Sequence, residues 1–199
     1  MKRLLATLSV LALLTACVDT TGISPQSSKT SNPKSNPNAA VTVTEYGDLQ
    51  CPACRAAYTI IDQPLLAQYG SQINFVWKQF PLTSLHQYAM AAAEASECAA
   101  DQGKFWEFLD TDYTNQDQLN NQSLETWAKQ LGLNMDLFDR CTKSHIKRKE
   151  ILAEYDEGQK LGVQGTPTFF VNGQMIQDNT LDSIGKAITD AEGSIKQKL

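Results

Sequence analysis

The segment EYGDLQCPAC, residues 45–54, decides how this chain is predicted to fold. It places Cys51 and Cys54 three positions apart, directly after residues 41–46, whose alternating side chains predict a β-strand. Pro52 suits the first turn of a helix, where a missing N–H group removes no hydrogen bond. The two cysteines are therefore predicted to lie where a strand ends and a helix begins.

Two cysteines at the start of a helix can close a disulfide or expose a thiolate. The unpaired N–H groups and the dipole of a helix N-terminus stabilise negative charge. Cys51 is nearer the end of the helix, so we expect it to have the lower pKa, in the range of about 3.5–7 known for such sites. Cys54, one turn further in, suits the resolving role. The spacing alone leaves two alternatives open, a structural disulfide and half of a zinc site.

Outward from this segment the chain alternates between strand and helix patterns. A second strand is predicted over 73–80 and a third over 168–171, where Asn-Gly at 172–173 indicates a hairpin that returns over 174–176. The last helix carries an apolar stripe at helical spacing, made of Leu181, Ile184, Ile188, Ala191 and Ile195. The fold class is therefore α/β, with about 84–161 predicted to be an inserted all-helical subdomain.

Local signals predict where several helices begin and end. Pro64 is expected to kink or end the first helix. Ser123 is a candidate N-cap within the insertion, and another helix is predicted from about Ser144 to Leu161. The basic run KSHIKRK, residues 143–149, is predicted to be a solvated helix face.

Residues 45–54 resemble the active-site segment of DsbA-like oxidoreductases of the thioredoxin superfamily. The segment GTPTFFVNG, residues 165–173, resembles the second signature of that family. The segments FPL at 80–82 and QGKFW at 102–106 also resemble sequences typical of the family. The resemblance extends from about Val41 to the C-terminus. It implies a thioredoxin-like fold and an enzyme that exchanges thiols and disulfides through its cysteine pair, without a cofactor.

The resemblance also implies roles for residues around the cysteine pair. Pro167 is expected to follow a cis peptide bond and to lie beside the cysteines, holding the Thr166 backbone where an extended substrate can pair with it. Pro52 and Ala53, between the cysteines, are expected to contribute to substrate binding. This dipeptide lacks the histidine of the best-known DsbA motif, and reducing thioredoxins and isomerases share the threonine at 166.

Glu45 is predicted to be an acid inside the core. It shares a strand face with Val41 and Val43, so the pattern points it inward, where burial raises the pKa of a carboxyl group. Such a group can exchange protons with Cys54 during turnover. The alternative is a glutamate at the strand end that reaches solvent. Lys78, on the next strand, is the expected charge partner of the buried acid.

Cys98 and Cys141 lie in the predicted helical insertion. Once Cys17 is set apart, four of the five cysteines remain, and this even number favours a structural disulfide between Cys98 and Cys141. Two buried free thiols are the alternative. His86 and His145 could in principle complete a zinc site with these cysteines, but no compact pair of ligand motifs is present. No metal is therefore expected.

The first residues are typical of a bacterial lipoprotein signal. Basic Lys2 and Arg3 precede a short apolar run over 4–14, which is too short to span a bilayer stably. The run ends in LTAC, which resembles a lipobox in which Cys17 is acylated and becomes the mature N-terminus. Residues 1–16 are then a signal peptide. An ordinary signal peptide with an incidental cysteine is the alternative.

The composition changes after the acylated cysteine. Residues 17–40 are rich in Ser, Thr, Asn and Pro and are predicted to form a disordered tether between the membrane and a domain over 41–199. An exported protein meets an oxidising environment, where disulfides persist. The chain is therefore expected on the extracytoplasmic (periplasmic) side of either envelope membrane. A formal net charge of −5 excludes a nucleic-acid partner.

The predicted function is the introduction of disulfides into exported cysteine-containing proteins through Cys51 and Cys54. The resemblance implies reoxidation by a membrane partner of the DsbB or VKOR type. A reductase or isomerase of exported disulfides is the alternative within this class, and a copper- or zinc-binding lipoprotein is the alternative outside it. A monomer is expected, because the sequence shows no dimerisation segment.

Overall fold

The structure is a computed structural model that describes residues 18–25 and 34–197. Its centre is a four-stranded sheet with the strand order β2-β1-β3-β4. The strands are β1 (Val41–Gly47), β2 (Ile73–Gln79), β3 (Thr168–Val171) and β4 (Gln174–Met175). β1 runs parallel to β2 and antiparallel to β3, and β3 runs antiparallel to β4. The predicted α/β class with a thioredoxin-like fold is confirmed.

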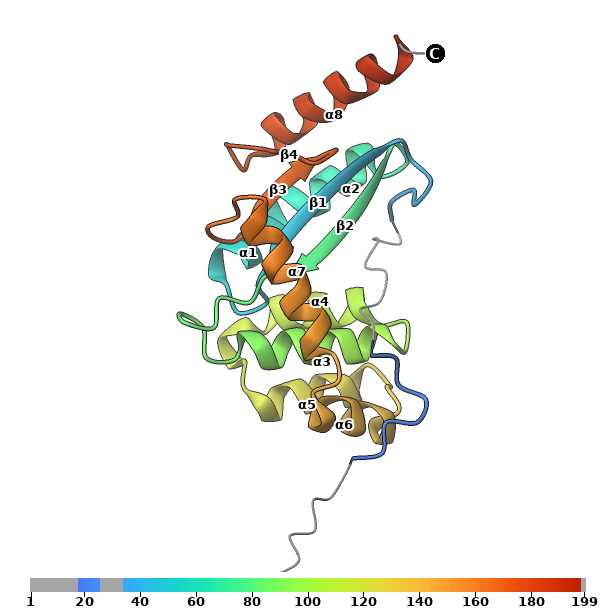
Figure 1. Ribbon diagram of the computed structural model, residues 1–199, viewed down its shortest axis with the longest axis vertical. Helices are drawn as coiled ribbons and strands as arrows, with labels where there is room; N and C mark the ends of the chain where they lie inside the picture. Colours follow the sequence, from blue (N-terminus) through green and yellow to red (C-terminus); the bar gives the residue numbers. More distant parts are fainter. Residues whose placement is uncertain (1–17, 26–33, 198–199) are drawn as a thin grey trace, which may run out of the picture.

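Helices surround this sheet on both faces and at one end. They are α1 (Pro52–Ala57), the π-helical turn η1 (Tyr58–Asp62), α2 (Gln63–Tyr69), α3 (Ala89–Ala100), α4 (Phe105–Thr114), the 3₁₀ turn η2 (Gln116–Gln118), α5 (Asn121–Gln130), α6 (Met135–Ser144), α7 (Arg148–Lys160) and α8 (Leu181–Lys196). Figure 1 shows α3 to α6 as a separate helical layer beyond the ends of β1 and β2. This layer and α7 form the helical insertion predicted from the sequence.

The two faces of the sheet have different helical partners because side chains alternate along each strand. On one face Val43 and Phe169 pack with Ile184 and Ile188 of α8 and with apolar residues of α1 to α2. On the other face Tyr46, Phe80 and Phe170 form a smaller cluster against α7. Phe80 stacks on Tyr155 of α7 with ring centroids 4.3 Å apart. Glu45 therefore faces α1 to α2, and Lys78 faces α7.

Gly158 allows α7 to lie close against the sheet. A Cβ atom at this position would come within 2.8 Å of the Phe80 ring and 3.0 Å of the Tyr46 ring. Any larger residue would push α7 away from β1 and β2, and α7 is the helix that returns the chain from the insertion to β3.

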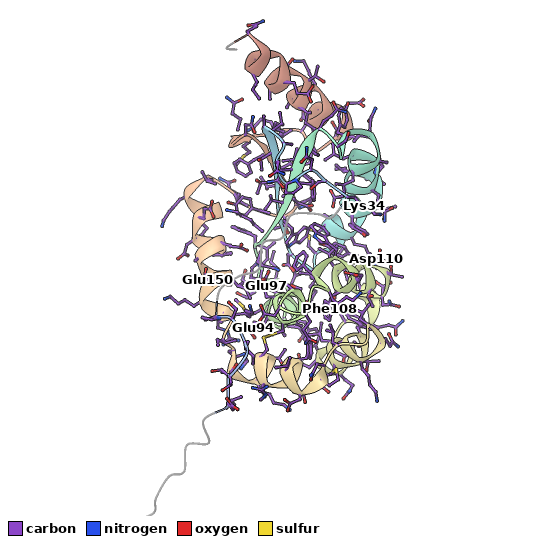
Figure 2. The ribbon with its side chains drawn as sticks, turned by 90° about the vertical axis from the view of Figure 1, so that its right-hand side faces the viewer. Lys34, Glu94, Glu97, Phe108, Asp110 and Glu150 are labelled. Carbon is purple, nitrogen blue, oxygen red and sulfur yellow. A yellow bond between two sulfur atoms is a disulfide. The ribbon has the colours of Figure 1, made fainter. Side chains whose placement is uncertain are left out.

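The helical layer has its own apolar core, and the cysteine pair reaches into it. Phe108 is fully buried and makes ring contacts with Trp127 and Phe138, and Figure 2 shows it within the helical layer. Cys51 and Cys54 belong to the same continuous cluster of buried side chains. The insertion is thus packed directly against the site and is not a separate appendage.

A disulfide joins Cys98 of α3 to Cys141 of α6, with an S–S distance of 1.98 Å. These two sulfurs bond to each other, so they are not available as the zinc ligands considered above. His145 instead lies 2.8 Å from a carboxylate oxygen of Glu94. The disulfide links the helix next to the sheet with the outer part of the helical layer.

The hairpin predicted at 172–173 is confirmed. Asn172 and Gly173 both have positive φ angles, 47° and 80°, as a two-residue turn between antiparallel strands requires. The apolar stripe of the last helix is also confirmed, because Ile184 and Ile188 are fully buried.

The first helix differs from the prediction at Pro64. The helical run continues to Tyr69 and passes through η1, in which the Gln63 N–H bonds to the carbonyl of Tyr58, five residues back. This wider turn accommodates the proline, whose ring would clash with the carbonyl one turn back in a regular α-helix. The expected break is therefore absorbed as a π-helical turn.

Two predictions within the insertion are wrong. Asn120, and not Ser123, caps α5, because the Asn120 side chain accepts a hydrogen bond from the Ser123 N–H. The basic run does not form a solvated helix face, because His145 adopts a left-handed conformation that ends α6. The following turn buries Lys147 completely, and its Nζ lies 2.6 Å from Asp101.

The predicted disordered tether makes fixed contacts where the structure describes it. Arg140 of α6 donates to the carbonyl oxygens of Asp19 and Thr21 at 3.0 Å. The Asn36 N–H bonds to the Ile73 carbonyl at 2.8 Å. Polar residues predicted to stay in solvent therefore find backbone partners along the domain. Residues 1–17, which include the predicted signal peptide and Cys17, lie outside the described residues.

The disulfide closes a long loop, so its removal should destabilise the fold. Cys98 and Cys141 are 43 residues apart, and the chain-entropy model gives about 4 kcal/mol for a loop of this length. The double variant Cys98→Ala/Cys141→Ala should therefore unfold at a clearly lower urea concentration. An unchanged midpoint in urea denaturation followed by circular dichroism would contradict this stabilising role.

Candidate active site

Cys51 lies at the N-cap of α1, where the predicted strand-to-helix junction is confirmed. Its backbone is extended (φ −76°, ψ 120°), and its N–H donates to the Asp48 carbonyl at 3.0 Å. The helical run that starts at Pro52 continues to Tyr69. The site is therefore at the positive end of a long helical run, where negative charge is favoured.

The two sulfur atoms have different surroundings. Cys54 is fully buried, and Cys51 keeps 6% of its surface exposed. Both are free thiols, so the structure represents the reduced protein. The Cys54 sulfur accepts a hydrogen bond from the Asp48 N–H at 3.5 Å, and the Cys51 thiol lies 3.4 Å from the Thr166 carbonyl oxygen. Only Cys51 is thus within reach of another molecule.

The surroundings of the two thiols shift their pKa values in opposite directions. Hydrogen bonding from the Cys54 thiol lowers the pKa of Cys51 to about 5, helped by the Thr166 hydroxyl and by the N–H groups of Cys54 and Ala53, while burial opposes the shift. Burial, followed by the same hydrogen bond, raises the pKa of Cys54 well above its ordinary value. At neutral pH the site therefore holds a Cys51 thiolate beside a Cys54 thiol.

The peptide bond between Thr166 and Pro167 is cis, and this turn lies directly against the Cys51 sulfur. The Pro167 carbonyl accepts a hydrogen bond from the Asn179 side chain at 2.7 Å. While Cys51 is a thiol, the Thr166 hydroxyl has no hydrogen-bond partner in the described part of the chain, so it can donate to the thiolate. A depression lined by Gly165, Thr166, Pro167 and Met175 runs along this turn.

Asp48 orders the loop before the cysteines, a role that the sequence reading missed. One of its carboxylate oxygens accepts from the Gln50 N–H at 2.8 Å. The other lies 2.9 Å from the Leu82 nitrogen and 2.7 Å from Nδ1 of His86. His86, considered from the sequence only as a conceivable zinc ligand, thus joins the loop after β2 to the active-site loop.

The helical insertion also holds the active-site loop. The Gln116 side-chain amide donates to the carbonyls of Leu49 and Cys51 at 2.6 and 3.1 Å. The Gln50 side chain in turn accepts from the Tyr88 N–H at 2.6 Å. Sequence reasoning missed these contacts, because they join segments that are far apart in the chain and carry no motif.

Glu45 is fully buried, so the solvent-exposed alternative is wrong. Its predicted ion pair with Lys78 is also wrong. In the register of the sheet Glu45 lies beside Trp77, and Lys78 lies beside Tyr46 on the opposite face. The Lys78 ammonium pairs with Glu157 of α7 at 2.5 Å. Burial and the nearby Asp62 carboxyl raise the pKa of Glu45 well above its ordinary value.

Metal binding was weighed from the sequence as an alternative. Across 18–25 and 34–197, no group of three or more His, Cys, Asp and Glu side chains is arranged to hold a metal ion. The arrangement of the cysteine pair is suited to thiol–disulfide exchange, because a stabilised thiolate is partly exposed at Cys51 and the shielded Cys54 thiol behind it is close enough to donate a hydrogen bond to it.

Comparisons with known proteins agree with this fold. The structure of a thioredoxin-like oxidoreductase from Silicibacter pomeroyi is 25% identical and superimposes with a TM-score of 0.70 over 81% of this chain and 94% of that protein. BdbD from Bacillus subtilis is 22% identical, with a TM-score of 0.70 over 83% of this chain and 97% of BdbD. The fold and the cysteine pair therefore define a member of the thioredoxin class.

The chain belongs to the family described as Thioredoxin, whose sequence profile matches residues 29–190. The thioredoxin-like family and fold implied by the sequence are thus confirmed, and the site is the cysteine pair of a thiol–disulfide oxidoreductase.

A curated relative, the Na(+)/H(+) antiporter NhaA 3 of Salinispora tropica, is 42% identical over 136 residues. The match covers 68% of this chain but only 21% of the relative, so the chain spans about a fifth of that protein. Within the residues that the structure describes, no helix has the length and apolar character needed to cross a membrane.

The pKa difference between the two thiols is directly measurable. The ultraviolet absorbance of the Cys51 thiolate in the reduced protein should titrate with a midpoint of about 5. Cys54→Ala removes the largest stabilising hydrogen bond and should raise this midpoint, and Thr166→Val should raise it less. A wild-type midpoint near the ordinary value of 9.0 would contradict the proposed stabilisation.

Proposed function

We propose that the chain oxidises the thiols of exported proteins, using the disulfide form of Cys51 and Cys54. The observation that carries the proposal is the low pKa of Cys51 at the N-cap of α1. A thiolate of low pKa is a good leaving group in disulfide exchange. Stabilising the reduced form in this way makes the disulfide a stronger oxidant, because the protein favours the state in which it has accepted electrons.

The reaction begins with attack by a substrate thiolate on the Cys51 sulfur, the more accessible of the two. The Cys51–Cys54 bond breaks, a mixed disulfide forms between substrate and Cys51, and Cys54 leaves as a thiolate. A second substrate thiolate then attacks the substrate sulfur and releases the Cys51 thiolate. The substrate has lost two electrons to the cysteine pair and carries a new disulfide.

The groups around the cysteines are proposed to bind the substrate and to supply a proton. The Thr166 backbone before cis-Pro167 is positioned to pair with an extended substrate segment, as in strand addition. Pro52 and Ala53 contribute exposed surface between the cysteines. Glu45 supplies the proton that the buried Cys54 thiolate needs when it leaves, because its carboxyl acts on Cys54 from the adjacent strand. These roles together define the catalytic and substrate-binding site.

Export and lipid attachment at Cys17 are part of the same proposal. The disulfide between Cys98 and Cys141 supports a compartment in which disulfides persist. An acylated Cys17 would hold the domain at the extracytoplasmic surface of a membrane, within reach of a quinone-linked reoxidant of the DsbB or VKOR type. The domain itself is proposed to work as a monomer.

The proposed reaction is tested with a reduced, unfolded protein that forms one disulfide when native. The oxidised chain should form that disulfide stoichiometrically, and catalytically when oxidised glutathione is supplied. Cys51→Ser should abolish the reaction, while Cys54→Ser, once joined to substrate through Cys51, should be unable to release it by internal attack. If the wild-type chain instead reduces substrate disulfides and leaves the thiols unoxidised, it is a reductase and the oxidase proposal falls.

Lipid attachment is tested by growth of a bacterial host with labelled palmitate. The wild-type chain should carry the label and remain with the membranes, and Cys17→Ser should lose both properties. Label retained by Cys17→Ser, or a wild-type chain released without lipid, would overturn this part of the proposal.

A further inference from the structure

Asp62 places a second carboxyl group beside Glu45. Glu45 comes from β1, and Asp62 is the last residue of the π-helical turn η1. Their exposed fractions are 0% and 1%. The two groups act directly on each other, and they are close enough to share a hydrogen bond when one of them carries a proton.

These two carboxyls lack the partners that buried acids normally have. None of their four oxygen atoms accepts a hydrogen bond from another residue that the structure describes. Among the described residues, no ion pair joins either group to a lysine, arginine or histidine. Lys78 pairs instead with Glu157, and His86 pairs with Asp48. An unpaired buried carboxylate is costly, and two adjacent ones are costlier still.

The other titratable groups around the pair are also acidic. Tyr113 of α4 is 3% exposed, and its hydroxyl has no hydrogen-bond partner within 18–25 and 34–197. It lies near Cys54, Glu45 and Asp62. Tyr58 of η1 is also close enough for an electrostatic interaction with the Asp62 carboxyl. The Tyr58 hydroxyl donates a hydrogen bond to Asp110 of α4 at 3.0 Å.

Cys51 at the N-cap of α1 and Cys54 within α1 complete these surroundings, so β1, η1, α4 and the start of α1 all contribute acids or thiols. Because no cation among the described residues pairs with either carboxyl, the pair satisfies its oxygens by retaining a proton between them.

We propose that Glu45 and Asp62 act as one proton-holding unit for Cys54, in which Asp62 is a positioning residue that acts through Glu45. The pair keeps one proton between its carboxyls and exchanges a second one with the Cys54 sulfur. This inference deepens the proposed function and rests on Cys54 being the resolving cysteine. Burial raises the pKa of Asp62 to about 7, so the second proton is gained and lost near neutral pH.

The proton balance of the cycle is complete. When substrate attack breaks the Cys51–Cys54 bond, the doubly protonated pair gives one proton to the departing Cys54 thiolate and keeps the other. Solvent then restores the second proton. In the reverse direction, the singly protonated pair accepts the Cys54 proton, and the resulting thiolate attacks a mixed disulfide at Cys51. Electrons move only between sulfur atoms, and protons only between the pair, Cys54 and water.

The coupling is tested by carboxyl carbon-13 NMR of the oxidised chain, with Cys17→Ser to prevent acylation. In this otherwise unaltered protein the Glu45 and Asp62 signals should change together and show the same two inflections with pH. In Asp62→Asn, the Glu45 signal should show one inflection, about one pH unit or more below the upper inflection of the pair. Independent titration of the two signals, or an unchanged Glu45 profile in Asp62→Asn, would overturn the pair.

Proton transfer is tested on the Cys51–glutathione mixed disulfide by following the release of glutathione as Cys54 attacks. Asp62→Asn should slow release by about tenfold at neutral pH, because Glu45 alone remains as proton acceptor. It should also remove the inflection near pH 7 from the rate profile, while the Cys51 pKa stays unchanged.

The matched control is Glu154→Gln, which alters a half-buried acid whose pKa burial also raises, to about 8, but which bonds to the Gln79 N–H away from the cysteines. It should leave the release profile unchanged. A wild-type profile in Asp62→Asn, or the same loss in Glu154→Gln, would overturn the proton role. Both measurements use only this chain and glutathione, so a failure to oxidise protein substrates would overturn the proposed function and leave this result standing.

Discussion

The stabilised thiolate of Cys51 is the interaction on which the rest of this structure depends. It exists because β1 ends next to the start of a long helical run, which places one sulfur at the N-cap and the other one turn inside. The Cys54 hydrogen bond and nearby N–H groups then favour the charged form of Cys51. The cis turn at Pro167 faces the same sulfur, so the proposed function places substrate binding and electron transfer at one atom.

The helical insertion and the sheet share the task of keeping that geometry. Gln116 holds the loop carbonyls, while Asp48 links the loop to His86 and to the Cys54 sulfur. Next to Cys54 the protein buries two carboxyl groups, Glu45 and Asp62, rather than a carboxylate paired with a cation. A buried cation would neutralise them, whereas an acidic cluster must keep protons near Cys54.

Much of the fold could be predicted because it depends on local patterns. The hairpin follows from two residues that tolerate positive φ, and α8 follows from a regular apolar stripe. The prediction that Lys78 pairs with Glu45 was wrong because of the strand register. Glu45 lies beside Trp77, and side chains alternate along a strand, so the side chain of Lys78 is on the opposite face of the sheet. Asp62 left one signal, an acid on the apolar side of the first helix, but its closeness to Glu45 depends on tertiary packing that no motif encodes.

The central claim is that the protein stabilises the reduced cysteine pair through the Cys51 thiolate. The most direct test is the reduction potential of Cys51–Cys54, measured by equilibration with a glutathione buffer. The claim predicts a potential of about −120 to −180 mV, in the range of oxidising members of this fold. A potential of about −270 mV, as in reducing thioredoxins, would contradict it.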